Sequence, residues 1–299
     1  MSSQRATAFV PGHVTAFFSA HPDDDPAVAG SRGAGVTLTD GVTVRVSAAD
    51  GATGDAAAAV DAVSAGSGSR TIDGEAGSIG AVEDVLADLN AAEAAVAVET
   101  DLQIGAGFGV SGAAALGAAL AANEAFDRGR SENDLVRVAH AAEVGRGTGL
   151  GDVVAQARGG VPVRLEPGAP AVGELDGVPA SARVEYVTFG ELSTEDVLGG
   201  DTTALSAAGE DALDRLRVDP QLPTLFDAAR EFAREADLLV PEVAEAVDAV
   251  DAAGGEAAMA MLGRTVFALG TGLSDAGYEP EACRVDAAGA RLVDGRGRE

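Results

Sequence analysis

The chain has 299 residues and carries 48 acidic side chains against 20 basic ones, which gives a formal net charge of −28 and an isoelectric point near 4.2. All of the basic residues are arginine. A surface with this excess of acid repels nucleic acid and anionic membranes, so neither is expected as a partner.

The acidic residues are spread along the sequence, which argues against a disordered acidic tail. Together with the lack of lysine, this composition predicts a halophilic protein, because screened acidic side chains keep a surface hydrated in concentrated salt. The single cysteine, Cys283, excludes an internal disulfide framework. The sequence has no basic-plus-apolar leader and no apolar run of about 18 residues, so we expect a soluble, cytoplasmic protein.

The first half of the chain alternates between strand and helix patterns. The alternation of apolar and polar residues over 42–48 predicts a strand with one buried face. A helix is expected around 81–90, then another strand, a glycine-rich segment and a helix over about 111–126. Ser131 and Asp134 have the spacing of a capping box, which predicts the start of the next helix.

A stretch rich in proline and glycine, from Pro167 to Pro179, is the best candidate for a domain boundary. Beyond it we expect a strand, three amphipathic helices within 201–253, a hairpin that turns at Gly263 and two short strands. Strands and helices are interspersed without a strict βαβ rhythm. The sequence therefore predicts an α+β protein with two domains, at 1–168 and 169–299.

The segment "IGAGFGVSGAAALGAALAAN", 104–123, joins several glycines to the start of an alanine-rich helix. Glycines allow a close backbone approach, and a helix N-terminus offers unpaired N–H groups, so a phosphate is the natural ligand. A P-loop is excluded because the chain has no lysine. The spacing of Gly107, Gly109 and Gly112 also fits a dinucleotide-binding fingerprint, and close packing alone would explain the glycines equally simply.

Three motifs in the order of one kinase superfamily favour a nucleoside triphosphate. "GAGFGVSGAA" resembles the phosphate-binding motif of the GHMP small-molecule kinases. "FVPGHVTAFF" resembles their first motif, a Pro-Gly-basic turn that leaves the first strand, and "GLGDVVAQARGG" resembles their Gly-x-x-Asp helix and Gly-Gly turn. The chain departs from the pattern at Gln103 and Val110, and its third motif keeps only Gly263.

Within this superfamily, "PGHVTAFF", "GSRGAGV" and "AMAMLGRTVFALG" are together similar to the archaeal pantoate kinases. The resemblance spans nearly the full length. It implies a two-domain GHMP kinase fold, with an N-terminal half like ribosomal protein S5 and a ferredoxin-like C-terminal half. It also implies ATP and Mg²⁺ as cofactors, pantoate as the substrate and a homodimer.

The resemblance assigns the phosphate contacts to one run of residues in the glycine-rich segment. The expected nucleotide-binding residues are Gly105, Gly107, Phe108, Gly109, Val110, Ser111 and Gly112. Ser111 and Glu143 match the metal-binding pair, and both would supply the hard oxygen ligands that Mg²⁺ prefers. Asp152 matches the carboxylate that accepts or orients the proton of the attacking hydroxyl, although a helix N-cap would explain an aspartate there too.

Pantoate carries a carboxylate, and arginine is suited to bind it with two parallel hydrogen bonds. Arg164 is the favoured anchor and Arg32 the second choice. Ser31 and His140 are expected to add hydrogen bonds. His13 stands at the basic position of the first motif, where it would touch substrate or phosphate, whereas "SAHPDDDP" around His21 has the pattern of a solvated loop.

Besides NAD binding, which the dinucleotide-binding fingerprint would indicate, two alternatives stay open from the sequence. Another GHMP kinase, acting on mevalonate, homoserine or shikimate, would share the phosphate-binding motif and differ in the pocket for the acceptor alcohol. A nucleotide-binding protein without catalysis would also keep the glycine-rich segment, although Ser111, Glu143 and Asp152 together favour an enzyme.

Overall fold

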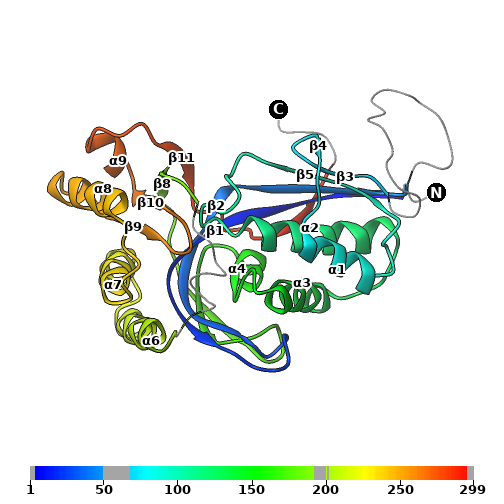
Figure 1. The fold of residues 1–299 in the computed structure, drawn as a ribbon, viewed down its shortest axis with the longest axis horizontal. Coiled ribbons are helices and arrows are strands. Elements are labelled where there is room, and N and C mark those ends of the chain that lie inside the picture. Colours follow the sequence, from blue (N-terminus) through cyan, green and yellow to red (C-terminus); the bar gives the residue numbers. More distant parts are fainter. Residues whose placement is uncertain (1–3, 50–67, 192–199, 201, 295–299) are drawn as a thin grey trace.

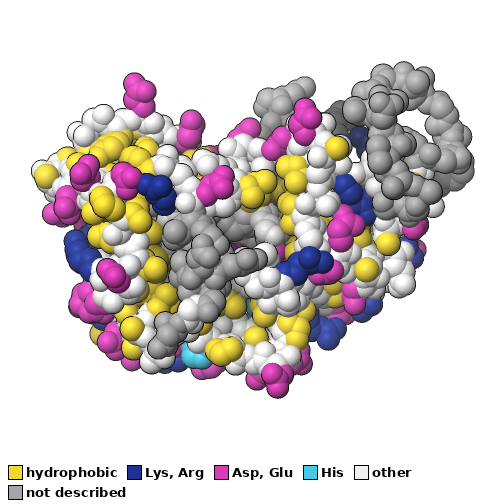
Figure 2. Space-filling view, viewed as in Figure 1, with side chains coloured by type: hydrophobic (Ala, Val, Ile, Leu, Met, Phe, Trp, Pro, Cys, Tyr) yellow, Lys and Arg dark blue, Asp and Glu magenta, His cyan; other side chains and the backbone are white. Residues whose placement is uncertain are grey.

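The computed structural model describes residues 4–49, 68–191, 200 and 202–294. In this part of the chain, two β-sheets and their helices lie side by side, and a long β-hairpin reaches from one group to the other (Figure 1). The predicted α+β class is confirmed. Acidic side chains are scattered over the face in Figure 2. No helix among the described residues is long and apolar enough to cross a bilayer.

The first sheet is built on the hairpin of β1 (Arg5–His21) and β2 (Gly30–Ser47), whose antiparallel register runs from Arg5 opposite Ser47 to His21 opposite Gly30. It has eight strands in the order β12-β1-β2-β5-β3-β4, with β6 paired to β2 and β7 paired to β6. The other strands of this sheet are β3 (Arg70–Ile72), β4 (Glu75–Ala76), β5 (Ala95–Thr100), β6 (Val161–Glu166), β7 (Glu174–Val178) and β12 (Arg291–Val293).

The expected turn after the first strand is wrong. β1 continues through Pro11 and Gly12, where the register shifts against β2 as in a β-bulge. A bulge bends a strand without ending it, and Figure 1 shows the β1–β2 hairpin curving along its length. His21 is likewise the last residue of β1 instead of part of a loop.

Four helices lie along the first sheet (Figure 1): α1 (Gly80–Asp88), α2 (Val110–Ala125), α3 (Glu132–Arg146) and α4 (Asp152–Arg158). Ser131 caps α3 by accepting a hydrogen bond from the Asp134 N–H, which confirms the predicted capping box. The alanine-rich α2 is buried along most of its length. Its small side chains allow a close approach to the sheet, since a Cβ at Gly117 would lie 2.6 Å from Val44 Cγ2.

The second sheet has four strands in the order β11-β8-β10-β9. These are β8 (Arg183–Thr188), β9 (Ala257–Ala260), β10 (Thr265–Leu269) and β11 (Glu281–Arg284). Helices α6 (Thr203–Val218), α7 (Leu222–Glu235), α8 (Pro241–Ala252) and α9 (Gly272–Asp275) belong to the same part of the chain. Phe226 of α7 packs against Phe267 of β10, with 4.9 Å between the ring centroids. The predicted hairpin at Gly263 and the three amphipathic helices are confirmed.

The two sheets share the chain differently from the expected domains. β7 and β12 follow residue 168 in sequence, yet both belong to the first sheet. β7 also lies inside the proline- and glycine-rich stretch, where it pairs with β6. The division at 168 and 169 stays a prediction.

Candidate active site

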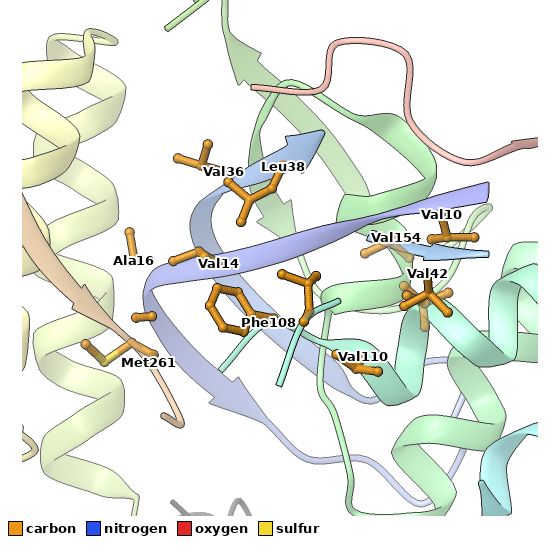
Figure 3. Packing of buried hydrophobic residues seen from close by; sticks show 14 of the residues in the cluster. Val10, Val14, Ala16, Val36, Leu38, Val42, Phe108, Val110, Val154 and Met261 are labelled. Carbon is orange, nitrogen blue, oxygen red and sulfur yellow. The ribbon is translucent and has the colours of Figure 1, made fainter. Parts of the chain in front are cut away.

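The glycine-rich segment is a loop that places apolar side chains in the hydrophobic core and glycines at the wall of a cavity. Ala106 and Phe108 are fully buried and belong to the main hydrophobic cluster, where Phe108 and Val14 are seen in Figure 3. Gly107 and Gly109 take left-handed φ values of 90° and 63°, which glycine adopts without strain. Gly109 is the N-cap of α2. The buried residues therefore anchor the loop, and the glycine backbone is left to line a cavity.

This cavity has a volume of about 440 Å³. The predicted residues Gly105, Gly107, Phe108, Gly109, Val110, Ser111 and Gly112 all line it. Glu143 and Asp152 line it as well. Seven further residues line the cavity and were not predicted from the sequence: Thr15, Ile104, Gly147, Thr148, Glu191, Met261 and Leu262.

Ser111 and Glu143 meet at the start of α2. The Ser111 hydroxyl donates a hydrogen bond of 2.5 Å to Glu143 Oε1. Glu143 is only 3% exposed, and burial raises the pKa of its carboxyl to about 7, although the bond from Ser111 partly opposes the shift. Glu143 forms no ion pair with any described residue. The site thus holds a buried carboxylate and a hydroxyl without a neutralising cation, and these are donors of the kind that Mg²⁺ takes.

Asp152, the first residue of α4, is held by a histidine from β1. His13 Nδ1 lies 2.7 Å from Asp152 Oδ1, and the imidazole is completely buried while the carboxyl keeps 21% of its surface exposed. Burial lowers the pKa of His13, and its bond to Asp152 offsets this only in part. A neutral His13 therefore donates its Nδ1–H to Asp152, and its Nε2 is left without a partner among the described residues.

The same bond keeps Asp152 ionised. Burial alone would raise the pKa of the Asp152 carboxyl, but the hydrogen bond from His13 and the nearby positive charge of Arg164 outweigh it. The net result is a pKa below the ordinary value. The carboxylate at the cavity wall is consequently available as a proton acceptor at neutral pH.

Arg164 of β6 is the largest of the fully buried side chains, at 2% exposure. Its Nε and Nη1 make no hydrogen bond to any described residue. Burying an unpaired guanidinium is costly, so a bound anion is the expected partner. A Cβ at Gly151 would lie 2.7 Å from Arg164 Nε and 2.6 Å from Ser31 Oγ, which means that these two polar groups converge where position 151 has no side chain.

His140 and Arg32 have partners of different kinds. His140 Nε2 donates to the backbone oxygen of Ala29 at 2.9 Å, and burial lowers the pKa of its ring. Arg32 donates through Nε to the backbone oxygen of Leu165 and through Nη1 to Glu210 Oε2, both at 2.6 Å. The structure therefore places Arg32 in a separate ion pair with α6. Of the two candidate anchors, Arg164 is the one whose Nε and Nη1 have no partner among the described residues.

The model of the family "GHMP kinases N terminal domain" matches residues 78–160, which include the glycine-rich loop, Glu143 and Asp152. A pantoate kinase of Thermococcus kodakarensis is 36% identical over 265 residues, which cover 88% of this chain and 86% of that protein. A pantoate kinase of Methanospirillum hungatei is 32% identical over 278 residues, covering 90% and 89%.

The chain belongs to the pantoate kinase family. Among solved structures, a "Phosphotransferase related to CoA biosynthesis pathway" is 30% identical, with a TM-score of 0.80 and coverage of 98% of this chain and 100% of that one. Homoserine kinase from Cytophaga hutchinsonii, at 15% identity and a TM-score of 0.69 over 98% of both chains, shows a shared fold alone. The two-domain GHMP kinase fold expected from the motifs is thus confirmed, and with it the family of pantoate kinases.

Three of the lining residues that we missed belong to the part of the chain that holds the second sheet. Met261 and Leu262 form the turn between β9 and β10, and Glu191 follows β8. Leu262 takes a φ of 63°, a conformation that a branched side chain rarely adopts. The sequence signal was weak because this turn keeps only Gly263 of a usually glycine-rich motif.

Proposed function

We propose that the protein transfers the γ-phosphoryl group of ATP to the C4 hydroxyl of (R)-pantoate, giving (R)-4-phosphopantoate for coenzyme A biosynthesis. One observation carries this proposal above the rest. Asp152 lines the glycine-rich cavity, and the positive charge of Arg164 helps to lower the pKa of its carboxyl. The Nε and Nη1 of this arginine have no partner among the described residues. A base between a phosphate site and a carboxylate site is what a kinase for a hydroxy acid needs.

The glycine-rich loop would hold the triphosphate. Its backbone N–H groups and the N-terminus of the 16-residue helix α2 favour anions at the cavity wall. Among the described residues, the cavity wall contains the acidic side chains of Glu143, Asp152 and Glu191 and no arginine. Backbone groups and a metal ion must therefore offset the phosphate charge.

Ser111 and Glu143 would hold Mg²⁺. Their hydroxyl and carboxylate oxygens fit a hard cation, and the buried Glu143 has no competing ion pair with a described residue. When bound, Mg²⁺ supplies positive charge to the β- and γ-phosphate oxygens. Glu143 must lose its proton to act as a ligand, so its raised pKa makes this step dependent on pH.

Asp152 would orient the C4 hydroxyl and accept its proton as the new bond to phosphorus forms. His13 keeps the acceptor oxygen in place through the bond at 2.7 Å. Arg164 would bind the carboxylate of pantoate, with Ser31 and His140 beside it as hydrogen-bonding groups. This arrangement fixes the substrate at the end opposite to its reacting hydroxyl.

Two further proposals concern the solvent in which the enzyme works and its oligomeric state. The acidic, lysine-free composition supports work in a salt-rich cytoplasm. The family resemblance supports a homodimer. Sedimentation or light scattering in molar KCl would test the dimer, since a monomer under these conditions would contradict it.

The proposed reaction is tested by ADP release with Mg-ATP in molar KCl, over a panel of pantoate, pantothenate, mevalonate, homoserine and shikimate. Pantoate alone should support turnover. Turnover with a different alcohol would keep the kinase fold's chemistry and reject pantoate as substrate. ATP binding without turnover on any alcohol would favour a non-catalytic protein.

A further inference from the structure

The turn between β9 and β10 is pressed against the glycine-rich loop. A Cβ at Gly263 would lie 2.0 Å from the Ala106 oxygen, so the two backbones touch at a point where a side chain has no room. From the other side, a Cβ at Gly107 would lie 3.0 Å from the Met261 oxygen. The Met261 N–H also donates to the Thr15 oxygen of β1 at 2.9 Å. The second sheet therefore bears directly on the loop that lines the cavity.

One side chain of β10 donates a hydrogen bond to the glycine-rich loop. Thr265, the first residue of β10, is completely buried, and its hydroxyl donates to the Ala106 oxygen at 2.8 Å. Thr188 of β8 is paired with Thr265 in the sheet, and the two hydroxyl oxygens lie 3.0 Å apart. A threonine hydroxyl has one proton to donate. Because Thr265 gives that proton to Ala106, the Thr188 hydroxyl must donate to Thr265.

The bond has consequences for the nucleotide site because of where Ala106 lies. Ala106 is fully buried between Gly105 and Gly107, both of which line the cavity. A buried carbonyl that loses its partner costs free energy and tends to move toward a new one. Any such movement rotates the peptide unit that joins Ala106 to Gly107, and this unit carries the N–H of the cavity-lining Gly107.

We propose that Thr265 is a positioning residue for nucleotide binding, which acts through its hydrogen bond to the Ala106 carbonyl and thereby sets the orientation of the Gly105–Gly107 backbone. The proposal rests on the assignment of this cavity to ATP under the proposed function. It does not depend on which alcohol is the acceptor. Thr265 acts only through the loop that is assigned to the nucleotide. Its effect therefore appears in the affinity for the nucleotide and not in the affinity for pantoate.

The test compares T265V with T265S and T37V. Valine keeps the branched shape and removes the donor, whereas serine restores the donor without the methyl group. Thr37 is the matched control, because it is also a fully buried threonine whose hydroxyl donates its one proton to a backbone oxygen, with those of Gly160 at 2.9 Å and Asp286 at 2.8 Å both within reach. Neither acceptor lines the cavity.

Calorimetric titration with Mg-ADP is the main readout, with the melting temperature and both KM values measured beside it. We expect the Kd for Mg-ADP to rise about tenfold in T265V and to stay within about twofold of wild type in T265S and T37V. The KM for pantoate at saturating ATP should change less than about twofold in T265V.

Two results would overturn the assignment. One is an unchanged Kd for Mg-ADP in T265V, and the other is an equal loss of affinity in T37V, which would mark a general effect of lost stability. Failure of the proposed function is seen separately. Wild-type protein that binds Mg-ADP but phosphorylates no alcohol rejects the reaction and still leaves the comparison of the three variants decisive.

Discussion

Glu143 Oε1 lies 2.5 Å from Ser111 Oγ, although the two residues are 32 positions apart on different helices. This contact puts a nearly inaccessible carboxylate at the N-terminus of α2. Its pKa of about 7, against an ordinary 4.5, means that below about pH 7 the folded protein without metal favours the neutral carboxyl. Two quantities should therefore depend on pH: the stability of the protein without metal and its affinity for Mg²⁺.

E143Q should stabilise the metal-free protein at pH 8. A carboxyl with a raised folded pKa contributes stability that is present below the unfolded pKa and is lost as the pH rises from about 4.5 to about 7. The loss is on the order of 3 kcal/mol for so buried a group. Thermal melts without divalent cations should show E143Q melting above wild type at pH 8, with the difference shrinking at pH 5. The same difference at both pH values would contradict the buried carboxyl.

Affinity for Mg²⁺ should weaken as the pH falls below about 7, because the Glu143 carboxyl must be deprotonated to bind metal. Titration of Mg²⁺ in the presence of ADP, between pH 5.5 and 8.5, measures this. In E143Q the affinity should be low and nearly independent of pH. A wild-type affinity that stays constant over this range would remove Glu143 from the metal site.

D152N should lower kcat by a factor of about 10² to 10⁴, the usual contribution of a general base. Asparagine keeps the shape and can still accept from His13 Nδ1–H through its amide oxygen, so the fold and Mg-ADP binding should be preserved. Single-turnover kinetics together with Mg-ADP titration separate the two effects. Full activity in D152N would leave Asp152 as a helix-start residue only.

R164M should raise the KM for pantoate by about 100-fold, the scale seen when one partner of a buried charge pair is removed. The ligand-free variant should also melt a few degrees higher than wild type, since the unpaired guanidinium is costly to bury. R32M is the comparison, because Arg32 is already paired with Glu210. A larger rise in the KM for pantoate in R32M than in R164M would move the carboxylate anchor to Arg32.

Stability should fall progressively as KCl is lowered from molar to about 0.1 M, since a net charge of −28 is then poorly screened. Thermal melts in a KCl series measure the change, and sodium chloride should substitute for KCl while sucrose should not. Equal protection by sucrose would show that screening of charge is not the cause.

The order of motifs along the sequence predicted the GHMP kinase fold, which is confirmed. The structure brings the predicted residues Ser111, Glu143 and Asp152 to one cavity, and their roles stay predictions. The sequence could not show that Glu143 is buried, because in so acidic a chain most glutamates lie on solvated helix faces. Burial depends on how α3 packs, which no local pattern encodes.

Long-range contacts were beyond prediction for the same reason. The bond between His13 and Asp152 joins residues 139 positions apart, and only the packing of α4 against β1 brings them together. β12 joins the first sheet from the far end of the chain, and Thr265 reaches the glycine-rich loop across 159 positions. A bulge at Pro11 and Gly12 likewise replaced the expected turn, because the tertiary pairing of β1 with β2 overrides a local turn signal.

Product analysis by phosphorus NMR tests the central claim most directly. Purified protein in molar KCl with Mg-ATP and (R)-pantoate should form one phosphate monoester whose phosphorus couples to the C4 methylene protons, and D152N run alongside should form it far more slowly. Absence of this ester would contradict the proposed function. So would a phosphate ester that forms only when mevalonate, homoserine or shikimate replaces pantoate.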